Sequence, residues 1–205
     1  MANIFEYHGG SVIGMKGKNC VAIAMDRRLG SQYKTVGMNF QRIFKMTDRC
    51  LLGLIGLGGD VQSFSAFLKY RINLYSLKEG RSIQPRTLGW LLATSLYKKR
   101  FGPYFIEPVL AGLDENNEPY LATTDSIGTM TDKDDFFCIG TGSELLLGAC
   151  ESFYKQDLEP DDLFEVVAQS MLSGTDRDAF SGWGAVVYII TPEGITAKTL
   201  KARMD

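Results

Sequence analysis

Residues 17–28 read GKNCVAIAMDRR, an apolar run that follows a short polar turn and ends on an acid and two arginines. The turn, Lys18-Asn19, has the composition of a tight β-hairpin. We therefore predict two antiparallel strands, residues 11–17 and residues 20–26, with Asp26 at the end of the second strand.

A second pair of strands is predicted downstream of this hairpin. Residues 42–46 and 51–57 are apolar runs that flank a turn at Asp48-Arg49. The uncharged stretch 50–57 is typical of a strand whose sheet is covered on both faces. We therefore expect helices on the outer sides of the strands.

Apolar residues recur at helical spacing after the second strand pair. Between residues 60 and 77 they stand three or four positions apart, which predicts a helix with one buried face: Val61, Phe64, Leu68, Ile72 and Tyr75. Gly80 should end this helix. A second helix is predicted over residues 85–100, with Pro85 in its first turn and Gly102-Pro103 beyond its end.

The rest of the chain repeats this alternation. Thr141 and Glu144 match a capping box, in which two side chains bind free amides at a helix start. Another helix is predicted over residues 161–173. Further strands are predicted at residues 108–113, 120–124, 135–139, 185–190 and 195–200. The order of strands and helix pairs predicts an α+β fold, a four-layer αββα sandwich.

The composition is that of an ordinary globular protein, with 45% hydrophobic and 22% charged residues. A net charge of −2 favours neither nucleic acid nor an anionic membrane as the main partner. No apolar run is long enough to span a bilayer, and no secretion signal is evident, so we expect a cytoplasmic and nuclear protein. No linker or repeat divides residues 1–205, which predicts a single domain.

Several kinds of active site are excluded by residue type. His8 is the only histidine, which argues against a Ser-His-Asp or Cys-His arrangement. The four cysteines are separated by 30, 88 and 12 residues, which matches no zinc or CxxC pattern. Each cysteine lies in an apolar stretch, so we expect buried free thiols and no cofactor for catalysis.

Two further segments carry information together with residues 17–28. They are the GTGS run at residues 140–143 and the RDAFSG run at residues 177–182. Together the three segments resemble the β-type subunits of the proteasome core, and residues 99–104 and 199–205 resemble the type-3 branch of that family. The resemblance covers nearly the whole chain and implies the sandwich of the N-terminal nucleophile hydrolases.

Active members of that family expose a threonine by autolysis, and an aspartate and a lysine assist its hydroxyl in attacking a peptide carbonyl. If Asp26 is that aspartate, the resemblance places Gly10, 16 residues earlier, at the nucleophile position. It places Arg42, 32 residues after Gly10, at the lysine position. Glycine has no hydroxyl, and arginine stays charged near neutral pH, so it does not shuttle protons. A slip of one residue offers only Gln41 or Ile43.

Asp26, Asp178 and Ser181 occupy positions that match the family's site. Buried hydrogen-bonding residues of this kind also serve structure alone, and we interpret these three in that way. The resemblance thus implies a non-catalytic subunit of the β ring in the ATP- and ubiquitin-dependent degradation machine.

Two alternatives remain open. Cleavage after Gly10 would expose Ser11 as a nucleophile, but Ser11 is one residue out of register, and along a strand that shift turns a side chain to the opposite face. The other alternative is a free-standing binding domain without partners. An active hydrolase predicts loss of the residues before Ser11, whereas a binding domain predicts a soluble monomer.

The resemblance also implies partners and a shared pocket. The chain would stand between the type-2 and type-4 subunits of a β ring, in contact with the α ring and with the opposite β ring. Asp125 and Thr129 match the positions that face the substrate pocket of the adjacent type-2 subunit. Asp125 would attract basic substrate side chains there, although the alternative is an aspartate that only stabilises its own turn.

A structural magnesium ion is a further expectation. Thr175, Asp178 and Ser181 can offer carbonyl oxygens to a hard cation, and related subunits hold ions at matching places. Asp205, the last residue of the sequence, would complete such a site across a subunit interface. The alternative is a hydrogen-bonded turn and a solvated tail.

Overall fold

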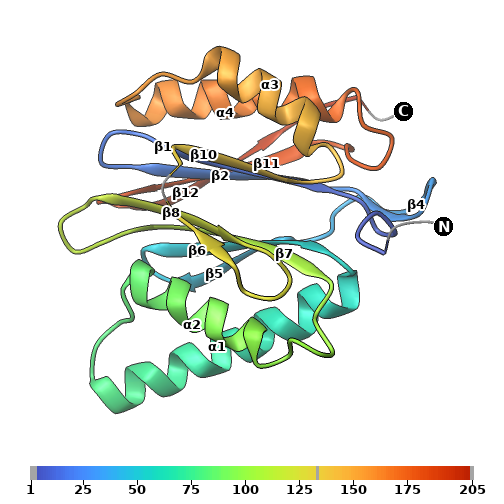
Figure 1. Ribbon diagram of the computed structural model, residues 1–205. Helices are drawn as coiled ribbons and strands as arrows, with labels where there is room; N and C mark the ends of the chain where they lie inside the picture. The colour runs from blue at the N-terminus through green and yellow to red at the C-terminus, as the bar shows by residue number, and fades with distance from the viewer. Residues whose placement is uncertain (1–3, 133, 204–205) are drawn as a thin grey trace.

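The structure, a computed structural model, describes residues 4–132 and 134–203. Two five-stranded antiparallel sheets lie face to face, and a pair of helices covers the outer side of each (Figure 1). The prediction of an α+β four-layer sandwich is therefore confirmed. No helix within the described residues combines the length and the apolar character needed to cross a bilayer.

The first sheet has the strand order β10-β1-β2-β11-β12. Its strands are β1 (Ser11–Lys16), β2 (Val21–Asp26), β10 (Phe136–Gly140), β11 (Ala185–Thr191) and β12 (Gly194–Leu200). Its outer face is covered by α3 (Ser143–Phe153) and α4 (Pro160–Thr175).

The second sheet has the order β5-β6-β7-β8-β9. Its strands are β5 (Ile43–Thr47), β6 (Cys50–Gly56), β7 (Ile106–Leu113), β8 (Pro119–Thr124) and β9 (Met130–Thr131). Its outer face is covered by α1 (Gly58–Glu79) and α2 (Pro85–Tyr97).

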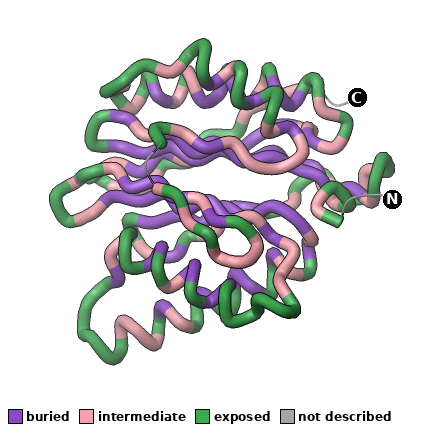
Figure 2. The backbone as a smooth tube through the Cα atoms, viewed as in Figure 1, coloured by how far each residue is buried: buried purple, intermediate pink, exposed green. Residues whose placement is uncertain are grey.

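Buried residues form three apolar layers, one between the sheets and one under each helix pair. In Figure 2 the strands are mostly buried, and the exposed residues lie on the outer helices and loops. Strand β1 serves two of these layers, because Val12 packs between the sheets while Ile13 and Met15 pack under α3 and α4. Neighbouring positions at the start of β1 therefore face different parts of the molecule.

Some elements differ from the sequence-based expectations. A small hairpin, β3 (Leu29–Ser31) and β4 (Lys34–Gly37), was not predicted, because its strands are too short to show a pattern. It lies near the N-terminus (Figure 1). Helix α2 ends at Tyr97 rather than at residue 100. The Lys99 amide bonds to the Leu96 carbonyl three residues back, which is the tighter spacing of a closing turn.

Candidate functional site

Gly10, the position expected to carry a nucleophile, lies directly before β1. Its φ angle is +112°, a conformation that residues with a side chain rarely adopt. A Cβ atom on Gly10 would lie 2.3 Å from Nε and 2.4 Å from Cζ of Arg42. Position 10 therefore has neither a hydroxyl nor the space for one.

Arg42 fills the space beside Gly10. Its side chain is 2% exposed, and its guanidinium donates through Nη2 to the carbonyl of Gly9 at 2.9 Å and to the carbonyl of Arg28. The Nη1 atom lies 3.4 Å from Oδ1 of Asp26, an ion pair, but forms no hydrogen bond within the described residues. The guanidinium carbon also stands 5.1 Å from the ring centre of Phe40.

The Asp26 carboxylate joins three segments that are distant in sequence. Oδ1 accepts the Ser11 amide at 3.0 Å, and Oδ2 accepts the amides of Arg28 at 3.2 Å and Gly182 at 3.1 Å. Burial raises the pKa of Asp26, while Arg42 and these three amides lower it. Since every one of these contacts is a donor, they favour the carboxylate form.

The Ser11 side chain is not part of the Asp26–Arg42 ion pair and lies on the side of the sheet that α3 and α4 cover. Its hydroxyl is fully buried, accepts the Gly142 amide at 3.1 Å and lies 2.8 Å from the Ser181 hydroxyl. The Ser181 hydroxyl donates to Oδ2 of Asp178 at 2.6 Å, so the Ser11 hydrogen points to Ser181. The Ser11 hydroxyl is therefore enclosed in a hydrogen-bonded chain.

Thr141 belongs to the same chain, which corrects the predicted capping box. Its hydroxyl donates to Oδ2 of Asp178 at 2.6 Å. Helix α3 instead begins after Gly142, and no side chain caps it. Thr141 does not cap the helix because its side chain turns toward the half-buried Asp178 carboxylate, to which the hydroxyl donates, while Glu144 is exposed. The sequence pattern carries no sign of this contact, because the two residues are 37 positions apart in the chain.

The segment before Gly10 is bound to the rest of the fold. The carbonyls of Tyr7 and His8 accept the amides of Gln32 at 2.8 Å and Gly30 at 3.0 Å. Nδ1 of His8 accepts the Gly58 amide at 3.0 Å, at the start of α1. Sequence reasoning missed this role of His8 because its partner lies 50 residues away.

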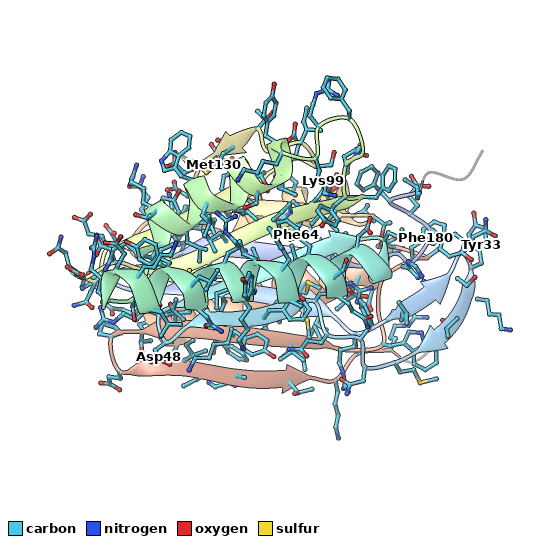
Figure 3. All side chains as sticks on the ribbon, turned by 90° about the horizontal axis from the view of Figure 1, so that it is seen from below. Tyr33, Asp48, Phe64, Lys99, Met130 and Phe180 are labelled. Carbon is cyan, nitrogen blue, oxygen red and sulfur yellow. The ribbon has the colours of Figure 1, made fainter. Side chains whose placement is uncertain are left out.

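The β3–β4 hairpin covers the loop that carries Asp178 and Ser181. The rings of Tyr33 and Phe180 lie at the same edge of the molecule, with centroids 4.9 Å apart (Figure 3). Arg28 extends to the same place and donates to the Phe180 carbonyl at 2.9 Å. The unpredicted hairpin thus helps to enclose the candidate site.

Asp125 and Thr129 form a tight loop after β8. Oδ1 of Asp125 accepts the amides of Ile127 at 3.0 Å and Thr129 at 2.7 Å, and both side chains are exposed. Glu107 lies close by: burial raises its pKa, the Gly140 amide lowers it, and the charge of Asp125 raises it again. The loop is therefore a self-stabilised turn that carries an exposed carboxylate.

The three described residues expected to bind magnesium line one pocket of about 220 Å³. The Asp178 carboxylate is already occupied, because it accepts the Phe180 amide and the Thr141 and Ser181 hydroxyls. Any cation there would have to use the carbonyls of Thr175, Asp178 and Ser181. The charged residues among those that line the pocket are two arginines and two aspartates, so their charges balance: Arg28, Arg203, Asp176 and Asp178. Asp205 lies outside the described residues.

We predict that Gly10→Ala lowers the free energy of unfolding by more than about 2 kcal/mol, since it combines backbone strain with a clash against Arg42. Gly182→Ala is the matched control: Gly182 has φ +137°, but nothing lies within 4 Å of its would-be Cβ. Chemical unfolding of both variants separates the clash from the strain. Equal losses would contradict the account.

A double-mutant cycle with Arg42→Lys tests the same contact. The slimmer lysine leaves room beside position 10, so Gly10→Ala should cost less in that background than in the wild type. Strictly additive effects would show that Arg42 does not fill this space.

A second prediction concerns pH. Burial, and then the charge of Arg42, lowers the pKa of His8 from its ordinary 6.5. Folding thus favours the neutral ring. The contribution of His8 to the free energy of unfolding is complete above about pH 6.5 and is lost as the pH falls through the lowered pKa. The melting temperature should therefore drop between about pH 7.5 and about pH 5.5.

His8→Asn supplies the control, because its Oδ1 replaces the Nδ1 acceptor and does not titrate in this range. The variant should lose less of its melting temperature than the wild type over the same interval. An identical loss in both proteins would exclude His8 as the cause.

Comparisons with known proteins identify the family of this chain. The sequence profile of one family, described as "Proteasome subunit", matches residues 6–190. The chain is 50% identical over 203 residues to "Proteasome subunit beta type-3" of Picea mariana, and 49% identical to "Probable proteasome subunit beta type-3" of Schizosaccharomyces pombe. It is 49% identical over 204 residues to "Proteasome subunit beta type-3" of Drosophila melanogaster. In all three cases the match covers 99% of this chain and 100% of the relative. The chain therefore belongs to the proteasome subunit family.

Proposed function

We propose that this chain is a non-catalytic β-type subunit that holds a place in the β ring of a proteasome core. One observation carries the proposal: the Arg42 guanidinium occupies the space that a nucleophilic side chain at position 10 would need. The full-length similarity to proteins named beta type-3 supports the place in the β ring.

The contacts around Ser11 argue against the alternative of an active hydrolase. The Ser11 amide donates to Asp26, and the Ser11 hydroxyl is fully buried in its own hydrogen-bonded chain. Cleavage after Gly10 would leave Gly9 as part of a separate fragment, although its carbonyl holds Arg42. Retention of the N-terminal segment is therefore part of the proposed function.

The proposed neighbours are the type-2 and type-4 subunits, the α ring and the opposite β ring. Exposed apolar side chains on both helix layers favour protein partners over a free monomer. On the α1–α2 side they are Tyr70, Leu77, Trp90, Tyr97 and Phe101, and on the α3 side Leu145, Leu147 and Phe153. We place the assembly in cytoplasm and nucleus, where such degradation takes place.

The first test is the mass of the mature chain in particles purified from its own cells. We expect a mass that includes the residues before Gly10, and no labelling of this chain by an electrophilic inhibitor directed at N-terminal threonines. The catalytic subunits of the same particles, which do react, serve as the positive control. A chain that begins at Ser11, or that carries the label, would refute the proposal.

We further propose that Asp125 adjusts the specificity of the adjacent type-2 pocket. The Oδ1 atom is bound within the turn, and the side chain is exposed, so its charge reaches a neighbour mainly through water. A partly hydrated pair of opposite charges is worth about 0.5–1 kcal/mol. Asp125, with Thr129 beside it, would thus change the preference for basic substrates by a few-fold.

Asp125→Asn in assembled particles tests this role, since the amide keeps an oxygen acceptor for the turn and removes the charge. Cleavage after basic residues should fall relative to cleavage after neutral ones. Asp114→Asn is the matched control, because Oδ1 of Asp114 makes the same two bonds, to the amides of Asn116 and Glu118, at the opposite end of β8. If both variants leave the ratio unchanged, Asp125 is only a turn residue.

Magnesium is proposed as a structural ion and not as a catalyst. The carbonyls of Thr175, Asp178 and Ser181 would hold it, with Asp205 of another subunit as the expected further ligand. Replacing magnesium by manganese in crystals of the particle should give an anomalous signal at this pocket. No signal there, with manganese bound elsewhere in the particle, would remove the ion from the proposal.

A further inference from the structure

Two cysteines face each other between β10 and α3. The Sγ atoms of Cys138 and Cys150 lie 3.6 Å apart, and neither forms a disulfide. A disulfide bond needs an S–S distance of about 2.05 Å, so the two sulfurs have to approach by roughly 1.5 Å. Rotation of the two short side chains supplies a movement of this size.

The two thiols differ in their access to solvent. Cys138 is partly exposed and lines a surface pocket of about 450 Å³, whereas Cys150 is fully buried behind it in the apolar layer under α3 and α4. Three carboxylates also line the pocket: Asp134, Asp135 and Glu151. Their charge repels anionic reagents such as glutathione and leaves the pocket open to a small neutral oxidant.

The surroundings of Cys150 suit a buried sulfur that attacks an oxidised Cys138. The hydrogen bond between the two thiols lowers the pKa of Cys150 and raises the pKa of Cys138, and burial raises both. Access to solvent, which Cys138 has and Cys150 lacks, therefore decides which thiol meets the oxidant first. The Ser170 hydroxyl beside Cys150 is buried and finds no hydrogen-bond partner within the described residues. It is therefore available to a thiolate at Cys150.

The geometry points to a peroxide-sensitive dithiol site in which Cys138 is oxidised first and Cys150 then closes a disulfide. Hydrogen peroxide oxidises the Cys138 thiol to a sulfenic acid and releases one water. The Cys150 sulfur attacks the sulfenic sulfur, the S–S bond forms and the S–O bond breaks, and the hydroxide leaves with the Cys150 proton as a second water. Two thiols and one peroxide thus give one disulfide and two waters.

The bond would link the helix layer to the sheet beside the candidate site. The loop that it closes contains Thr141 and Gly142, whose groups bind Asp178 and Ser11. The disulfide should therefore restrict the hydroxyl chain of the site and raise the melting temperature by several degrees.

The experiment treats the purified full-length chain with hydrogen peroxide, blocks the remaining thiols after unfolding, and maps the digested peptides by mass spectrometry without reduction. We expect a Cys138–Cys150 link with a mass lower by two hydrogens, which dithiothreitol reverses. The buried thiols of Cys20 and Cys50 are internal controls and should remain free. This mapping requires no substitution.

Two variants separate the steps. In Cys150→Ser, a sulfenic acid should accumulate at Cys138 and be trapped by dimedone, whereas in Cys138→Ser the buried Cys150 should stay reduced at the same dose. The inference is overturned if the wild-type chain keeps both thiols free under conditions that oxidise Cys138 in Cys150→Ser. It is equally overturned if Cys138 is never oxidised, or if Cys20 or Cys50 reacts first.

Discussion

The buried ion pair between Asp26 and Arg42 is the contact on which the rest of the site depends. Both side chains are shielded from water, at 0% and 2% exposure, which is costly for two charges unless donors and acceptors surround them. Three backbone amides bind the carboxylate, and two carbonyls bind the guanidinium. The pair thereby joins the ends of β1 and β2, the loop before β5, and the Gly182 loop.

This arrangement gives the Asp26–Arg42 pair a structural role. The Arg42 guanidinium lies where the side chain of residue 10 would project, and it donates a hydrogen bond to the carbonyl of Gly9. The residues before Gly10 thus supply a hydrogen-bond acceptor to the buried guanidinium, and their loss would leave Arg42 short of that acceptor. A subunit of this kind contributes shape and contacts to a ring, which is consistent with the exposed apolar side chains on both helix layers.

Much of the fold could be predicted from the sequence because period and length are local properties. The helical stripe from Val61 to Tyr75 and the turn at Lys18-Asn19 need no knowledge of distant residues. The hairpin β3–β4 and the hydrogen bond of Thr141 with Asp178 were missed, since both depend on tertiary contacts. The resemblance implied that Gly10 stands at the nucleophile position and Arg42 at the lysine position. Only the structure shows that the Arg42 side chain fills the space beside Gly10.

An experimental density map of the assembled particle tests this central claim most directly. We expect continuous density through Gly9, Gly10 and Ser11, with the Arg42 guanidinium between the Asp26 carboxylate and the Gly9 carbonyl. A chain that starts at Ser11, with Arg42 turned away from position 10, would contradict the account.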